Sequence, residues 1–250
     1  MMISKKVVVI GAGAAGLMAG ATAALYGASV TIIEKNKRVG RIIMITGKGR
    51  CNLANNCDVQ TFINNVPVNG RFLYSAINAF TPEDTIEFFE SKGLKTKTER
   101  GNRVFPASDK SVDVVDTMHD YAVESGCKIV CDTANALILE DGAVIGVKCE
   151  ENTYYADCVI ICCGGKSYPL TCSTGDGYTI AKQAGHTIVP LKPSLVPFTS
   201  GDKQCKDMQG LALKNVALRI VDKNSKKTVY SDFGEMLFTH FGMSGPMILS

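Results

Sequence analysis

Three glycines near the amino terminus, Gly11, Gly13 and Gly16, have the spacing GxGxxG. A glycine-rich turn between a strand and a helix lets backbone N–H groups approach a pyrophosphate, and the helix N-terminus adds partial positive charge. The first acidic residue of the chain, Glu34, follows at the distance where a carboxylate can accept hydrogen bonds from a ribose. These residues predict dinucleotide binding, and the acid at this position disfavours a 2′-phosphate.

A second stretch whose residue types could do chemistry is ITGKGRCNLANN, residues 45–56. It could be a phosphate cradle, a loop around a reactive cysteine or a basic surface turn. A P-loop is excluded because neither Ser nor Thr follows Lys48 and the glycine–lysine spacing is wrong. Metal binding is excluded because Cys51 and Cys57 have no matching pair at a ligand spacing. Next to a dinucleotide fold, the stretch is expected to be a cofactor-facing loop in which Cys51 packs and is not a nucleophile.

The chain has ten cysteines, and no two of them form a CxxC pair. Several lie inside apolar runs, which favours buried thiols in a reducing cytoplasm over disulfides. Cys162 and Cys163 are adjacent, but neighbours on a strand point to opposite faces of the sheet. The pair is therefore expected to pack near a nucleotide and not to form a redox centre.

The elements that must position these residues begin with a buried parallel strand over Lys5–Ile10. A helix, LMAGATAALYG, and a second strand that ends at Glu34 follow. The stretch Val7–Ile33 carries no charge and so imitates a signal peptide or a membrane span. Its glycines and its β-branched second run favour strand, turn, buried helix and strand, with no membrane involved.

The middle of the chain predicts helices and then strands. A helical segment is expected over about 59–93, with Thr81 as N-cap, and another helix over 109–125 carries His119 on its surface. A β-meander is expected over about 127–157, with a hairpin turn at Asp141–Gly142. A buried strand then ends in Gly164–Gly165. The turn TGDG opens a further helix, with Thr174 and Asp176 as candidate caps.

Composition agrees with one large or two ordinary folded domains. Of 250 residues, 46% are hydrophobic and 20% are charged, with a net charge of +3. So small a net charge does not by itself imply a polyanionic partner.

The segments GAGAAG with Glu34-Lys35, GKGRCNLAN, RVFPASDKSVDVVD, ICCGGKSYP, STGDGYTIAKQAGH and GEMLFTHFGMSGP together resemble the BaiN/YhiN-like NAD(P)/FAD-dependent oxidoreductases. The resemblance implies an α/β chain with a Rossmann-like FAD-binding domain over 1–189, containing the helical segment and the inserted meander. It also implies the start of a β-rich second domain over 190–250. Members of the family are longer, and their C-terminal segment returns to the FAD domain, so this chain is expected to lack that part.

For the site, the resemblance adds Lys35 and Arg41 near the adenine and phosphates and the backbone near Ala134 against the adenine. The loops Gly47–Asn52 and Gly164–Asp176 would line the flavin side, with Arg50 or Asn52 as hydrogen-bond donors to the flavin. The expected cofactor-binding residues are Gly11, Gly13, Ala14, Ala15, Gly16, Glu34, Lys35, Arg41, Gly47, Gly49, Arg50, Cys51, Asn52, Ala134, Cys163, Gly164, Gly165, Thr174, Gly175 and Asp176. Tyr168, His240 and Cys51 are open alternatives for a proton donor, and the catalytic residue is unassigned.

The implied activity is reduction of an activated C=C bond of a small molecule by a flavin hydride, with NAD(P)H as a transient electron donor. One alternative is a flavoenzyme that forms dihydrouridine in rRNA, contacted by the cations Lys35, Lys37, Arg38, Arg41, Lys48 and Arg50. Another is a truncated, non-catalytic nucleotide-binding fragment. The substrate and the oligomeric state cannot be derived from the sequence.

Overall fold

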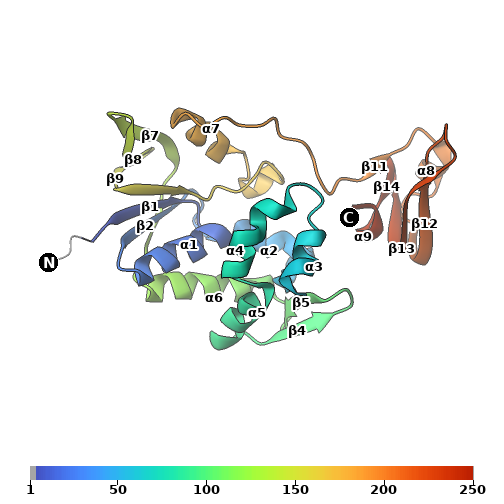
Figure 1. Ribbon diagram of the computed structural model, residues 1–250, viewed down its shortest axis with the longest axis horizontal. Coiled ribbons are helices and arrows are strands. Elements are labelled where there is room, and N and C mark those ends of the chain that lie inside the picture. Colours follow the sequence, from blue (N-terminus) through green and yellow to red (C-terminus); the bar gives the residue numbers. More distant parts are fainter. Residues whose placement is uncertain (1–3, 250) are drawn as a thin grey trace. The chain divides into compact units, whose positions relative to one another are not determined.

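The computed structural model describes residues 4–249. The chain divides into two compact units, the first ending at Ile188 and the second beginning at Val189 (Figure 1). Among the described residues, the first unit has three sheets and two hydrophobic cores, and the second has one sheet and one core.

A four-stranded parallel sheet forms the centre of the first unit. Its strands are β1 (Lys6–Ile10), β2 (Ser29–Glu34), β6 (Lys128–Cys131) and β10 (Cys158–Ile161), in the order β10-β1-β2-β6. The central strand β1 pairs on both sides, with Val7 opposite Cys158 and Val30. The continuous apolar run predicted a parallel strand that is buried on both faces, and this prediction is confirmed.

The alternation of side chains along β1 builds one core on each face of this sheet. Val7 and Val9 pack with α1 (Ala14–Leu25) and α6 (Ser111–Glu124) on one face. Val8 and Ile10 pack on the other face against the meander and α7 (Asp176–Gln183). Figure 1 shows α1 and α6 on one side of β1 and β2 and the strands β7 to β9 on the other.

Close packing between α1 and the end of β1 depends on Gly16. A Cβ added to Gly16 would lie 1.8 Å from the carbonyl oxygen of Gly11. Only glycine therefore allows the helix to start directly after the strand, as the sequence pattern predicts.

The meander consists of β7 (Ala134–Glu140), β8 (Ala143–Cys149) and β9 (Thr153–Tyr155), and the hairpin turn at Asp141–Gly142 is confirmed. The expected limits of about 127–157 were too wide, because Lys128–Cys131 pairs with β2 in the parallel sheet. The apolar pattern predicted a strand there but could not tell which neighbour it would pair with.

Short elements between the second and third parallel strands form a peripheral layer. Helices α3 (Val59–Asn64), α4 (Tyr74–Ala79) and α5 (Pro82–Ser91) occupy the predicted helical segment, with the 3-10 helix η2 (Gly70–Leu73) between the first two. Thr81 caps α5 in a reciprocal capping box with Asp84, which confirms the predicted N-cap. The helix α2 (Arg41–Ile45), the 3-10 helix η1 (Thr46–Gly49) and a three-stranded sheet of β3 (Ala54–Asn55), β4 (Thr96–Glu99) and β5 (Arg103–Pro106) complete the layer.

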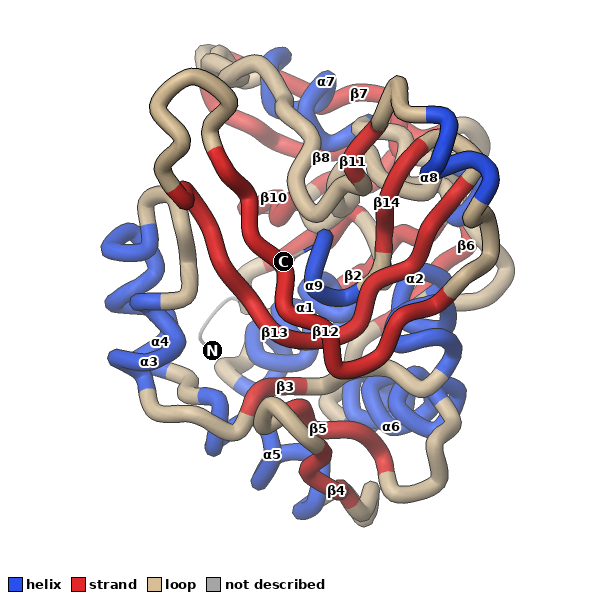
Figure 2. The backbone as a smooth tube through the Cα atoms, turned by 90° about the vertical axis from the view of Figure 1, so that its right-hand side faces the viewer, coloured by secondary structure: helices blue, strands red, loops and turns tan. Residues whose placement is uncertain are grey.

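The second unit is an antiparallel sheet in the order β11-β14-β13-β12. Its elements are β11 (Phe198–Thr199), α8 (Lys203–Asp207), β12 (Ala212–Val221), β13 (Thr228–Thr239), β14 (Gly242–Ser244) and α9 (Pro246–Leu249). Figure 2 shows β12 and β13 as a long hairpin with α9 beside it. Met247 and Ile248 of α9 pack with Met236 of β13 to form a small core.

Candidate functional site

A cavity of about 500 Å³ lies at the carboxyl ends of β1, β2 and β10. This is the edge of an open parallel α/β sheet where ligands generally bind. The structure brings eleven of the predicted cofactor-binding residues to its lining: Gly11, Gly13, Ala14, Ala15, Glu34, Lys35, Arg41, Ala134, Cys163, Gly164 and Asp176.

The N-terminus of α1 faces this cavity. Gly13 is the N-cap residue, and within the described chain no side chain caps the helix and its first turn carries no acid. A Cβ added to Gly13 would meet no described atom within 4 Å. The first turn therefore presents backbone N–H groups to open space, which is an arrangement suited to an anion.

Glu34 ends β2 beside this turn. Its Oε2 accepts a hydrogen bond from the Ala12 N–H at 2.8 Å, and its Oε1 accepts from the Asn36 N–H at 2.9 Å and the Asn36 Nδ2 at 2.5 Å. A carboxylate has about four acceptor positions, so about one remains for a ligand hydroxyl in this arrangement.

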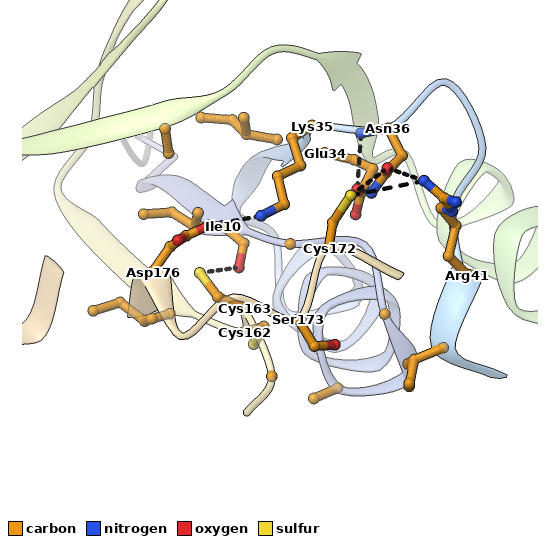
Figure 3. Close-up of a pocket in the computed structure, with 18 of the residues that line it drawn as sticks. Ile10, Glu34, Lys35, Asn36, Arg41, Cys162, Cys163, Cys172, Ser173 and Asp176 are labelled. Carbon is orange, nitrogen blue, oxygen red and sulfur yellow. Dashed lines mark hydrogen bonds and ion pairs between the residues drawn. The ribbon is translucent and has the colours of Figure 1, made fainter. Parts of the chain in front are cut away.

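Two cations cross from the β2–α2 connection to the segment 164–176. Lys35 Nζ contacts the Asp176 carboxylate at 2.6 Å and the Thr174 hydroxyl at 3.0 Å. The Lys35 hydrogen bond holds the pKa of Asp176 below its usual range, so this carboxylate stays ionised near neutral pH. Arg41 reaches the Leu170 carbonyl at 3.4 Å. It also lies 3.7 Å from the Cys172 sulfur (Figure 3).

Thr174, Gly175, Gly165 and Gly16 are outside the cavity lining as the structure describes it. The expected capping role of Thr174 and Asp176 was wrong, because Gly175 is the N-cap of α7 and neither side chain caps the first turn of the described helix. Instead, the Thr174 hydroxyl lies 2.9 Å from both oxygens of Asp176 while it accepts from Lys35.

The loop Gly47–Asn52 faces the small sheet, and none of its described residues lines the cavity. Arg50 Nη1 bonds Glu99 at 2.8 Å and Asp109 at 3.3 Å, and its guanidinium stacks on Phe105. With its amide turned to satisfy both groups, Asn52 donates to the carbonyl oxygens of Val104 and Ala54. The assignment of Gly47, Gly49, Arg50, Cys51 and Asn52 to a flavin site therefore stays a prediction.

The two adjacent cysteines at the end of β10 are packed thiols, whereas Cys131 and Cys158 are exposed. Cys162 packs against the core on the α1 side of the sheet and Cys163 against the opposite core, as expected for neighbours on a strand. Burial raises the pKa of Cys163 to about 11 and also raises the pKa of Cys51, so neither is a ready thiolate. All ten cysteines are free within the part of the chain described. The cytoplasmic location inferred from them stays a prediction.

The remaining candidate side chains are not among the described residues that line the cavity. Tyr168 is exposed in the segment after β10, and His240 follows β13 in the second unit, where its ring meets that of Phe241 edge to face. His119 lies on α6 with its ring 2.9 Å from Asp120. Among residues 4–249, no group of three His, Cys, Asp or Glu side chains could hold a metal ion. Nor does that range contain a helix that is both long and apolar enough to span a membrane.

Sequence reasoning missed Asn36, Asp132, Cys172 and Ser173, all of which line the cavity. Asp132 directly follows the end of β6, and Asn36 is the second residue after the end of β2; that position was the available signal. Cys172 has no such signal, because its place depends on the path of the segment after β10.

The parallel sheet, the glycine turn and the acid at the end of β2 define a Rossmann-like protein with a dinucleotide-type cavity. The family model described as "HI0933-like protein Rossmann domain" matches residues 5–245. The chain belongs to this HI0933-like family.

The curated relatives of this chain carry two different names. A 3-dehydro-bile acid delta(4,6)-reductase of Clostridium scindens is 30% identical over 95% of this chain and 57% of its own length. Ribosomal RNA dihydrouridine synthases of Haemophilus influenzae and Escherichia coli are each 30% identical over 97% of this chain and 59% of their own length. The chain thus spans less than two thirds of the length of these relatives.

Solved structures support the fold. A flavocytochrome c3 fumarate reductase in its open conformation superposes with a TM-score of 0.58 at 19% identity, covering 85% of this chain and 47% of the other. A 3-ketosteroid-delta4-(5alpha)-dehydrogenase of Rhodococcus jostii RHA1 gives 0.57 at 14% identity, covering 85% and 60%. At these identities the likeness concerns the fold alone.

Proposed function

We propose that this chain binds FAD in the cavity at the ends of β1, β2 and β10 and belongs to an oxidoreductase that reduces an activated C=C bond. The observation that carries the proposal is the uncapped N-terminus of α1, which faces open space at Gly13 inside that cavity. A pyrophosphate fits such a turn because backbone N–H groups and the helix dipole both stabilise negative charge.

The residues around the turn fit the rest of the ADP half of FAD. Glu34 keeps an acceptor position for a ribose hydroxyl. Arg41 lines the same cavity and provides positive charge for the phosphates; Lys35 also lines it, with part of its charge offset by Asp176. Ala134 lines the side of the cavity where the meander begins, which suits contact with an adenine. When bound, a flavin supplies the hydride chemistry itself. The protein residues then bind the cofactor, orient it and exclude water.

The reaction class rests on the family and on the name of the Clostridium scindens relative, a delta(4,6)-reductase. The proposed substrate is a small molecule whose C=C bond is activated by a neighbouring carbonyl, since such a bond accepts hydride at its β-carbon. NAD(P)H is the proposed transient electron donor. The donor of the proton is left unassigned among the polar groups of the chain.

The second candidate is rRNA modification, because two relatives at the same identity are named ribosomal RNA dihydrouridine synthases. The predicted polyanion-binding cations give it limited support. Lys35, Arg38 and Arg50 pair with Asp176, Asp116 and Glu99, respectively. Charges that are already paired release fewer counterions on contact with a nucleic acid, which weakens binding.

Titration of the purified chain with FAD, followed by the change in flavin fluorescence, tests the cofactor. Wild type is expected to bind FAD. Gly13→Val is expected to fold normally but to bind at least tenfold more weakly, because its side chain would fill the open space before the helix N-terminus. Gly201→Val is the matched control, since Gly201 also has open space around its Cβ position but does not line the cavity in the described structure. Equal FAD affinity for wild type and Gly13→Val would overturn the assignment of the site.

Anaerobic mixing of the FAD-loaded chain with NADH or NADPH tests the electron donor through loss of the oxidised flavin absorbance. Reoxidation by α,β-unsaturated ketones then tests the small-molecule reading. Restoration of dihydrouridine to rRNA from a strain lacking it, without reoxidation by any unsaturated ketone, would support the second candidate instead.

A further inference from the structure

The Asn36 side chain lines the cavity and has three side-chain hydrogen-bond partners there. Its Nδ2 donates to Glu34 Oε1 at 2.5 Å, and its Oδ1 accepts from Arg41 Nη1 at 2.7 Å. The same Oδ1 accepts a longer bond from the Cys172 thiol at 3.1 Å. Figure 3 shows Asn36 between Glu34, Arg41 and Cys172 at one side of the cavity.

The chemistry of its neighbours fixes the direction of this amide. A carboxylate can only accept and a guanidinium can only donate, so a flipped amide would oppose oxygen to Glu34 and NH₂ to Arg41. A side chain at this position must therefore donate on one side and accept on the other. Asn36 is half-buried: its bond to Glu34 is partly shielded from competing water, whereas its bond to Arg41 is exposed.

We propose that Asn36 is a positioning residue for the cofactor, holding the ribose-binding carboxylate of Glu34 and the phosphate-facing guanidinium of Arg41 in one fixed arrangement. This inference rests on the proposed FAD site. Without the amide, Glu34 keeps its bonds from the Ala12 and Asn36 backbone N–H groups, and Arg41 keeps its longer contacts to Leu170 and Cys172. The two side chains lose their shared partner, so part of their order has to be supplied at the cost of ligand affinity.

The charged and titratable groups that share a cavity or hollow with Asn36 come from several elements. Near the end of β2 they are Glu34, Lys35, Lys37, Arg38 and Arg41, and on α6 they are Asp116 and His119. At the ends of β6 and β10 they are Cys131, Asp132, Cys162 and Cys163. The last two are Cys172, before α7, and Asp176, the first residue of α7. All of these groups are present in every variant below. The pH dependence of FAD affinity that they cause is therefore measured with wild type and subtracted from that of each variant.

The decisive variant is Asn36→Asp, because its hydrogen-bonding pattern changes with protonation. When ionised, the introduced carboxyl group opposes the Glu34 carboxylate and cannot donate to it. When protonated, it donates to Glu34 and accepts from Arg41, as the amide does. FAD affinity of this variant is therefore expected to be about tenfold or more below wild type at pH 8, roughly the effect of losing one charge-assisted hydrogen bond. It is expected to move toward wild type at pH 5, because the neighbouring Glu34 carboxylate favours the protonated form of the introduced carboxyl group.

Asn36→Ala is expected to bind FAD, and ADP as a competitor, about tenfold more weakly at both pH values. Asn55→Ala is the matched control, because Asn55 is also half-buried and hydrogen-bonded but does not line the described cavity. Equal weakening of Asn36→Asp and Asn36→Ala at pH 5 and pH 8 would overturn the positioning role, as would wild-type affinity of Asn36→Ala. Failure of wild type to bind either FAD or ADP would overturn the proposed function together with this inference, so the two failures are distinguishable.

Discussion

Asp132 is a buried carboxylate that joins the parallel sheet to the meander. It accepts hydrogen bonds from the backbone N–H groups of Thr133, Glu151 and Asn152 and from the Asn152 side chain. Burial opposes its ionisation, but these four bonds outweigh burial and lower the pKa of Asp132. One side chain thus holds both the exit of β6 and the β8–β9 turn.

Asp132→Asn is expected to lower the free energy of unfolding at pH 7 by about 1–3 kcal/mol, because an amide NH₂ would face backbone donors. A carboxylate whose pKa is depressed by folding stabilises the protein above its unfolded pKa, and that contribution is lost as pH falls through the folded value. The difference between wild type and variant should therefore shrink below about pH 4. Urea unfolding across pH measures it, with Asp141→Asn on the exposed hairpin turn as the control; a constant difference at all pH values would contradict the role of the charge.

Lys48 adopts a left-handed backbone conformation, with φ 59° and ψ 41°. This region costs a non-glycine residue about 1 kcal/mol, and no ion pair of Lys48 is found among the described residues to offset the cost. Lys48→Gly is therefore expected to raise the melting temperature. Lys37→Gly, at an exposed lysine outside the positive-φ region, should lower it. A lower melting temperature for Lys48→Gly would show that this strain is not stored at Lys48.

At the residue scale, the sequence could predict the groups whose spacing carries the chemistry. Gly11, Gly13 and Glu34 follow a fixed pattern along one βαβ unit, so local sequence is sufficient. The position of Asn36 after β2 was a signal for the cavity, but its role could not be predicted, because its partner Cys172 is far away along the chain. The place of Arg50 could not be predicted either, because its partners Glu99 and Asp109 are also distant in sequence and hold its loop beside the small sheet.

Helix α5 shows how a local signal positions an element. The Thr81 hydroxyl accepts from the Asp84 N–H at 3.0 Å, and the Asp84 carboxylate accepts from the Thr81 N–H at 2.7 Å. Both bonds satisfy backbone donors that the start of a helix would otherwise leave unpaired. Phe89 of this helix is buried in the main core, so the cap also orients a core contact.

Thr81→Ala is expected to lower the free energy of unfolding by about 0.5–2 kcal/mol, the usual effect of losing such a cap. Thr85→Ala, one turn further along α5, removes only a bond to the Thr81 carbonyl and should cost less. Thermal unfolding followed by circular dichroism compares them, and a larger loss for Thr85→Ala would contradict the importance of the cap.

A helix or strand could be predicted where all the residues that specify it lie in one continuous stretch of sequence. The strand–helix–strand unit from β1 to β2 and the helical segment with its cap meet that condition. The partner of β6 and the N-cap of α7 do not. A short apolar run such as β6 pairs with whichever strand edge the tertiary fold leaves open. At α7, Thr174 and Asp176 both bond Lys35 and do not cap the helix.

At the scale of the whole molecule, the chain contains two compact units, and the cavity lies entirely in the first. Ligand binding stabilises the state that binds it, by about 2.7 kcal/mol at a concentration of 100 Kd. FAD is therefore expected to slow amide hydrogen exchange in β1, β2 and α1 of the first unit while leaving β12 and β13 of the second unchanged. Mass-spectrometric exchange with and without FAD measures this, and equal protection of both units would show that they respond as one.

The strand order β10-β1-β2-β6 also has a consequence for how the chain is made. One edge of β1 pairs with β10, whose first residue, Cys158, lies opposite Val7. At about 5–20 residues per second, a ribosome takes on the order of ten seconds to add the residues between them. During that time the valine-rich strand has one open edge, which is a template for pairing with another chain. A nascent chain of this kind is expected to depend on chaperones until β10 has been synthesised.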